Sequence, residues 1–308
     1  MLICALFGGI VSNNGGFRTL LAAANNTGNL ARKLRCPGSG AGMVRCMKAL
    51  PADVIALADA GRGHAPFLTP EWGPVLDGVE LTRSPIAMLV HGLEFTPRHT
   101  SVAAGSNTNE GSIFIRPKYP TGMTAGAYDA FITGLFANGG RAPNSTERAM
   151  IYSLYPPAAD NVANAAAVVG DAFFVCGTRF FLKYMAKAVK HGSYGYHFAH
   201  LRPFECTGVP VSWGIVHEAE LDYVFKTPLG GSVCPAFTPY GAEVGLKMRG
   251  EWAAYAGGGV PSSAWPRYDP GSDGYALFGG PGEPAQATET HRRKRECDFW
   301  EGFILARQ

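Results

Sequence analysis

The 308-residue sequence has no uninterrupted apolar run of the ~20 residues that a membrane-spanning helix needs. Its longest apolar stretch contains Asp171. Neither sign of charge is in large excess, because the formal net charge is only +3. The basic run HRRKR at 291–295 lacks interleaved aromatic residues and is interpreted as a solvated stretch before a C-terminal helix. We therefore expect no transmembrane segment and no nucleic-acid partner.

The seven cysteines include no Cys-x-x-Cys pair and no Cys/His spacing typical of zinc sites, so no metal site is expected. The first residues, MLICALFGGIVSNNGG, also lack a basic region and a small-residue cleavage site, and they make a poor signal peptide. They are interpreted as a helix end followed by a buried strand. We therefore expect that the fold begins upstream of Met1.

The rest of the chain alternates predicted helices with predicted strands. Helical spacing covers 17–34, two pieces of 43–60 separated by Pro51, 85–95, 124–136, 145–155, 162–190 with breaks near Gly170 and Gly177, 243–259 and 296–308. A buried strand is predicted at 100–106, and the alternation of residues 193–201 predicts a second strand. This order predicts an α/β chain with a mostly parallel sheet.

Two ionisable residues stand out by their position. Glu110 follows a predicted strand and lies among small and polar residues in GSNTNEGS, whereas His217 lies in WGIVHEAELDYVF and is followed by three acids. Taken singly, a histidine is more often structural and a carboxylate more often solvated. Together they have the acid-then-base order of α/β-hydrolases, about a hundred residues apart. There the acid orients the imidazole, which takes the proton of a serine.

These and three further stretches together resemble the C-terminal part of type-B carboxylesterases, the cholinesterase and carboxylesterase family. The stretches are WGPVLDGVELTRSPIAMLVHGLEF with the strand and acid loop after it, WGIVHEAELDYVF, RGEWAAYAGGGVPSSAWPRYDP, and the two ends ALFGGIVSNNG and CDFWEGFI. The third stretch resembles the family's tryptophan helix, a Gly-x-Pro turn and a Trp-Pro-x-Tyr strand. The resemblance covers almost the whole chain.

The resemblance implies an incomplete α/β-hydrolase fold, made of the C-terminal strands of a mostly parallel sheet with flanking helices. It also implies that Glu110 is the acid and His217 the base of a catalytic triad acting on a small carboxylic ester, with no cofactor. Where the family usually has glycine after the histidine, this chain has Glu218. That carboxylate would either raise the pKa of the imidazole or face solvent.

The Gly-x-Ser-x-Gly pentapeptide of α/β-hydrolases does not occur in the sequence. The nearest stretches are HGSYG at 191–195 and GSGAG at 38–42, and neither has the required pattern or order. In the family, the nucleophile lies just before the strand matched by LFGGIVSNNGG. We therefore expect residues 1–308 to form a single partial domain that lacks the N-terminal half with its serine and oxyanion loop. As a fragment, it would be inactive and would expose a sheet edge.

The resemblance also implies two disulfides, Cys36–Cys46 and Cys176–Cys297. Cys206 and Cys234 are a weaker third pair, Cys4 is left over, and free buried thiols are the alternative for all seven. Disulfides together with the sequons at Asn25 and Asn144 favour a secreted or luminal glycoprotein.

Two other functions remain open at this stage. One is a catalytically inactive, cholinesterase-like binding or adhesion module, and the other is a truncated, inactive product. The substrate is not specified, because pockets in this fold are built by variable loops. The aromatic residues Tyr152, Tyr155, Phe225 and Phe237 could line a gorge or pack in the core.

Overall fold

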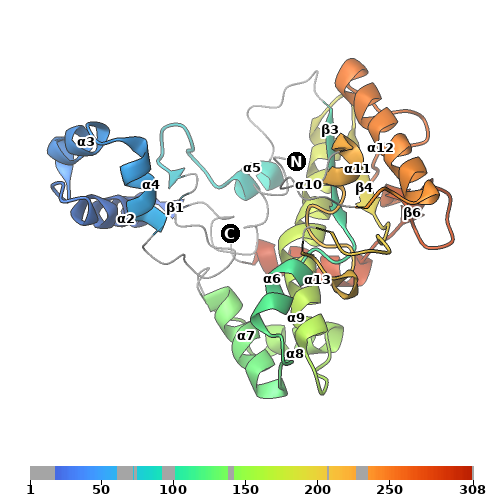
Figure 1. Ribbon diagram of the computed structural model, residues 1–308, viewed down its shortest axis with the longest axis horizontal. Helices are drawn as coiled ribbons and strands as arrows, with labels where there is room; N and C mark the ends of the chain where they lie inside the picture. Colours follow the sequence, from blue (N-terminus) through green and yellow to red (C-terminus); the bar gives the residue numbers. More distant parts are fainter. Residues whose placement is uncertain are drawn as a thin grey trace.

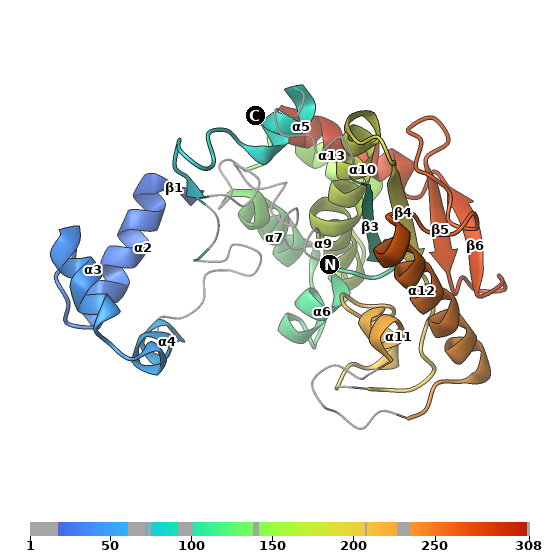
Figure 2. The ribbon, with the colours of Figure 1, turned by 90° about the horizontal axis from the view of Figure 1, so that it is seen from above.

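The computed structural model describes residues 18–60, 72, 75–91, 101–137, 142–206, 208–226 and 235–306. The main sheet has the strand order β3–β4–β5–β6, with β3 (Val102–Asn107), β4 (Ser193–Phe198), β5 (Gly274–Phe278) and β6 (Gln286–Thr290). The first three strands are parallel and β6 is antiparallel to β5, as Figure 2 shows from above. The predicted mostly parallel sheet is confirmed. The strand predicted before Asn13 lies outside the described residues, and so do Cys4 and Cys234.

Most of the described helices fall where the sequence predicts them (Figure 1). They are α2 (Leu20–Lys33), α3 (Gly40–Lys48), α4 (Ala52–Ala60), α5 (Pro85–His91), α6 (Ser112–Ile115), α7 (Ala125–Ala137), α8 (Ser145–Leu154), α9 (Val162–Gly170), α10 (Cys176–Ala188), α11 (Leu221–Phe225), α12 (Pro239–Gly258) and α13 (Lys294–Leu305). A parallel pair of short strands, β1 (Arg18–Thr19) and β2 (Val75–Leu76), lies near α2. Helices α2 to α4 stand apart from the main sheet in both views.

Helices cover both faces of the main sheet, so β4 is buried along its whole length. Tyr194, Tyr196 and Phe198 pack with Val244 and Met248 of α12 on one face. Helices α10 and α13 pack against each other, and α10 contacts β3 and β4 on the other face. Alternate residues of a strand point to opposite faces, which explains the alternation seen in the sequence of β4.

The long apolar stretch at 162–188 is a core element. By length and composition the helical run Val162–Ala188 could cross a membrane, but 94% of its apolar window is buried inside the protein. One predicted break is present, because a π-helical turn, Asp171–Val175, follows Gly170. The second predicted break lies at the other end of this turn, because the turn ends at Val175 and α10 begins at Cys176, next to Gly177.

Other local details differ from the sequence predictions. The helix predicted from residue 145 is capped by the residue before it, Asn144, which forms a capping box with Glu147. The Trp-Pro-x-Tyr segment at 265–268 is not a strand; it forms one isolated bridge, and its tryptophan is a buried core residue. The strands β5 and β6 were not predicted from periodicity, since β5 is buried on both faces.

Both expected disulfides are present. Cys36–Cys46 closes the loop between α2 and α3, and Cys176–Cys297 joins α10 to α13. Cys206 is also disulfide-bonded, whereas Cys234, its expected partner, lies outside the described residues.

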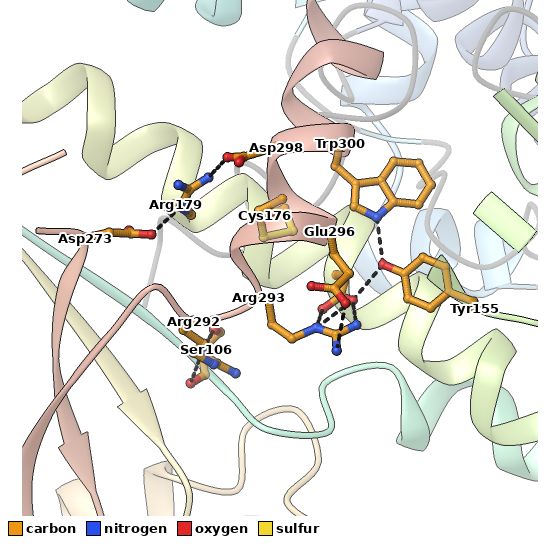
Figure 3. Close-up of a disulfide and its surroundings, with 12 residues drawn as sticks. Ser106, Tyr155, Cys176, Arg179, Asp273, Arg292, Arg293, Glu296, Asp298 and Trp300 are labelled. Atoms are coloured by element: carbon orange, nitrogen blue, oxygen red, sulfur yellow. Dashed lines mark hydrogen bonds and ion pairs between the residues drawn. A yellow bond between two sulfur atoms is a disulfide. The ribbon is translucent and has the colours of Figure 1, made fainter. Parts of the chain in front are cut away.

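Ion pairs surround the α10–α13 disulfide (Figure 3). Arg179 of α10 donates to Asp273 and to Asp298. At the N-terminus of α13, Arg293 pairs with Asp171, which also accepts a hydrogen bond of 2.7 Å from the Tyr155 hydroxyl. Burial, followed by the charge of Asp171, raises the pKa of Tyr155 far above its usual range. Tyr155 is only 2% exposed and packs in the hydrophobic core.

Candidate active site

The predicted acid and base lie within hydrogen-bonding distance. Glu110 follows β3, is only 2% exposed, and accepts a hydrogen bond of 2.6 Å at Oε1 from the backbone N–H of Asn107. Its other oxygen, Oε2, lies 2.6 Å from Nδ1 of His217. One carboxylate is thus fixed by its own loop and oriented toward the imidazole.

The acid loop is held in place by close packing on α9. A Cβ added at Gly111 would lie 2.0 Å from the carbonyl oxygen of Ala166 and 2.8 Å from the backbone nitrogen of Gly170. Only glycine permits this approach of two backbones. On the other side, Arg292 donates to the Ser106 hydroxyl at 2.7 Å (Figure 3). It also donates to the Asn107 carbonyl at 2.8 Å. The end of β3 is therefore fixed from both sides.

Hydrogen bonds from the acid loop also hold the histidine loop. Asn109 donates its backbone N–H to the Ile215 carbonyl and accepts the Ile215 N–H at Oδ1. The side-chain amide of Asn107 donates to the Val216 carbonyl at 2.8 Å. The turn entering the loop uses Gly214 with a positive φ of 80°, where a Cβ would lie 2.3 Å from Asn109 Oδ1.

Two aromatic rings flank the imidazole. The ring centroids of Phe114 and Phe174 lie 5.4 and 4.7 Å from that of His217. Phe174 belongs to the π-helical turn, so this irregular turn places a ring against the imidazole. The His217 side chain keeps 26% of its surface exposed, and within the described residues its Nε2 has no hydrogen-bond partner. The second nitrogen is thus available to another group.

The charge of the imidazolium is stabilised overall. Burial opposes the charge, but the hydrogen bond and charge of Glu110 outweigh it, and the charges of Glu218 and Glu220 add to them. The pKa of His217 is therefore raised above its ordinary value.

The three acids after the histidine have different surroundings. Glu218 is exposed and adopts a positive φ of 70°, a conformation that favours glycine, so the glutamate at this position is strained. Glu220 is buried, and Asn107 donates to its Oε2 at 2.6 Å. Burial, then the charge of Glu110, raises the pKa of Glu220. Asp222 pairs with Arg202.

The two serines weighed as nucleophiles are unsuited to that role. Ser193 is fully buried in β4 and donates to the Leu182 carbonyl. Ser39 precedes α3 inside the loop closed by Cys36 and Cys46. Neither lies on a strand-to-helix turn that would expose its hydroxyl.

A cavity of about 250 Å³ borders His217 and Glu218. Its wall is largely apolar and includes Phe198, Leu201, Phe204, Val211, Ile215 and Tyr223. Of the aromatic residues considered for a gorge, Phe237 stacks on Tyr223, Phe225 is 61% exposed, and the Tyr152 hydroxyl bonds to Asp129. None of these three lines the cavity.

The sequence profile of the carboxylesterase family matches residues 8–300. The chain belongs to the carboxylesterase family. It is similar to an acetylcholinesterase of Leptinotarsa decemlineata, with 28% identity over 281 residues that cover 84% of this chain and 41% of the relative. The chain thus spans about two fifths of the length of this curated relative. The mixed sheet with flanking helices agrees with the α/β-hydrolase fold of this carboxylesterase family.

The sequence did not reveal the residues that position Glu110 and His217. Asn107 and Asn109 were visible only as polar neighbours of Glu110, and Arg292 as part of a solvated basic run. Arg292 is in fact buried, with 8% of its side chain exposed. Asparagines flanking a candidate acid are the one signal that could have pointed to a hydrogen-bonded loop.

Proposed function

We propose that the chain supplies the acid and the base of a carboxylic-ester hydrolase that uses a Ser–Glu–His triad. The observation that carries this proposal is the 2.6 Å contact between His217 Nδ1 and Glu110 Oε2. A carboxylate at Nδ1 holds the proton there and leaves the Nε2 lone pair of the neutral ring for a hydroxyl. That tautomer is the one a general base requires.

In the proposed reaction His217 Nε2 takes the proton of a serine hydroxyl as the serine oxygen attacks the ester carbonyl carbon. Glu110 stabilises the imidazolium, which then gives the proton to the departing alcohol. Water attacks the acyl-enzyme by the same route and releases the acid. The mechanism uses no metal or organic cofactor.

The serine and the oxyanion donors have to come from outside the 308 residues, which contain no Gly-x-Ser-x-Gly. The proposed unit is therefore the C-terminal part of an esterase, and the chain alone is expected to be inactive at His217. The largely apolar cavity beside His217 supports an ester with an apolar group, and it does not distinguish lipid, choline or xenobiotic esters.

A secreted or luminal location is part of the proposal. Disulfides persist in oxidising compartments, and the two sequon asparagines, Asn25 and Asn144, are exposed. The Oδ1 of Asn144 accepts from the Glu147 N–H, so its amide nitrogen stays available for a glycan. Loss of mass on deglycosylation of the secreted protein tests this point.

The test of the function uses the full-length protein and p-nitrophenyl esters. His217→Ala is expected to lower kcat by at least about 10⁴-fold, and Glu110→Gln by about 10³- to 10⁴-fold. The matched control is His91→Ala, which removes an exposed imidazole at the end of α5. Equal activity of the wild type and His217→Ala would contradict the proposal and favour an inactive binding or adhesion module.

A further inference from the structure

A second hydroxyl–imidazole–carboxylate arrangement lies next to the Glu110–His217 pair and shares no residue with it. Thr108 Oγ1 lies 2.8 Å from His197 Nε2, and His197 Nδ1 lies 2.7 Å from Glu289 Oε1. Thr108 directly follows β3, His197 belongs to β4, and Glu289 belongs to β6. The function proposed above uses none of these three side chains.

The sheet register brings these residues together. Asn107 of β3 pairs with Phe198 of β4, so Thr108 lies just beyond the end of β3 and within reach of the histidine side chain. Glu289 pairs with Tyr275 of β5, the strand next to β4. The three residues are thus held by paired strands rather than by independent loops.

The direction of the hydrogen bonds follows from the charge of Glu289. Burial opposes that charge, but the hydrogen bond from His197 and the positive charge of Arg292 lower the pKa of Glu289. Arg292 Nε lies 3.8 Å from the carboxylate. An ionised Glu289 can only accept, so His197 donates at Nδ1 and must accept at Nε2. The Thr108 hydroxyl is then the donor to the imidazole.

The imidazole is in the form a general base requires. Burial, followed by the positive charge of Arg292, lowers the pKa of His197 below its ordinary value, so the ring is neutral at pH 7. The ring belongs to a residue that is 8% exposed, whereas Thr108 is exposed. The hydroxyl is therefore accessible while its base is shielded from water. The other acceptor near Thr108, the Phe198 carbonyl, is more distant at 3.4 Å.

We propose that Thr108 is a nucleophile, activated by the His197–Glu289 pair, that accepts acyl groups from activated carboxylic esters such as aryl esters. The Thr108 oxygen bonds to the ester carbonyl carbon while its proton passes to His197 Nε2. The carbon–oxygen bond to the aryl group then breaks, and His197 returns the proton to the departing phenolate. The products are a threonyl ester and a phenol, and no oxidant or further reactant is needed. This site does not depend on the function proposed for His217.

The test is acylation of the 308-residue chain with p-nitrophenyl acetate at pH 7. We expect stoichiometric release of p-nitrophenol and one acetyl group on the peptide that contains Thr108, located by mass spectrometry. Thr108→Val should abolish this label and Thr108→Ser should retain it. His197→Gln should slow labelling by about 10²- to 10⁴-fold, the usual contribution of a general base.

The matched control is Thr288→Val, which removes an exposed threonine one residue from Glu289, on the opposite face of β6. Labelling of Thr108 should be unchanged in this variant, and circular dichroism should confirm that each variant keeps the fold. An unlabelled Thr108 in the folded chain, or equal labelling in His197→Gln, would overturn the proposal. Because this chain has no triad serine, the result is independent of the full-length esterase assay.

Discussion

Asn109 and Ile215 exchange two hydrogen bonds: the Asn109 N–H donates to the Ile215 carbonyl at 2.8 Å, and the Ile215 N–H donates to Asn109 Oδ1 at 3.0 Å. These bonds join the loop that carries Glu110 to the loop that carries His217. The contact between the acid and the base is therefore supported by the backbone of both loops. A charged pair held in this way needs little reorganisation when a proton moves.

Replacing Asn109 with alanine should separate the two loops. The Ile215 N–H belongs to a buried residue and would lose its acceptor, at a cost of about 1–3 kcal/mol in the free energy of unfolding. Asn109→Asp keeps an acceptor oxygen at the same position and should cost less than about 1 kcal/mol. Urea denaturation measures both variants. Equal destabilisation would mean that the Oδ1 hydrogen bond does not hold the loops together.

Substitutions of Glu218 separate charge from backbone strain. Its charge contributes to the raised pKa of His217, so both Glu218→Gln and Glu218→Gly should lower that pKa, as measured by NMR titration of the imidazole. In the full-length enzyme, the acid limb of kcat/KM would move to lower pH, because the neutral imidazole would persist there. Only the glycine variant relieves the φ of 70°, and it should stabilise the fold by about 1 kcal/mol. A pKa of His217 unchanged in both would exclude the charge effect.

The two disulfides should differ in their contribution to stability. Cys176–Cys297 closes a loop with a sequence separation of 121, and Cys36–Cys46 one of 10. The chain-entropy relation gives about 5 kcal/mol for the first and about 3 kcal/mol for the second, as upper estimates. Double alanine variants of each pair, compared by thermal unfolding, should therefore show the larger loss for the pair that joins α10 to α13. The reverse order would indicate that α13 is held mainly by its ion pairs.

The parts of the fold that were predictable from sequence are those set by local chemistry. Helical periodicity located α2 to α5, Pro51 separated α3 from α4, and the apolar run before Glu110 located β3. The strands β5 and β6 were missed because burial on both faces, or a short exposed edge, leaves no clear alternation. The breaks predicted near Gly170 and Gly177 fall at the two ends of the π-helical turn, Asp171–Val175.

The acid and the base of the candidate site were predictable from the sequence, but the residues that hold them in place were not. The acid-then-base order and the resemblance identified Glu110 and His217, and the structure places them 2.6 Å apart. Their supports come from sequence-distant contacts: Arg292 reaches Ser106 across a separation of 186 residues. Spacing in a single sequence carries no information on such contacts. The same limit hid Thr108 and His197, which meet only when β3 and β4 pair.

The glycine after the acid provides a final prediction, on how the site is positioned. At Gly111 an added Cβ would lie 2.0 Å from the Ala166 carbonyl oxygen, whereas at Gly126 of α7 it would meet nothing within 4 Å. Gly111→Ala should therefore push the acid loop away from α9 and cost about 3 kcal/mol, the upper range for overpacking. Gly126→Ala, in the first turn of α7, should instead be neutral or stabilise by up to about 1 kcal/mol, because alanine has the higher helix propensity. In Gly111→Ala the pKa of His217 should also fall toward its ordinary value, since Glu110 would move with the loop. If NMR titration finds that pKa unchanged while stability falls, the packing of Gly111 supports the fold without positioning the carboxylate.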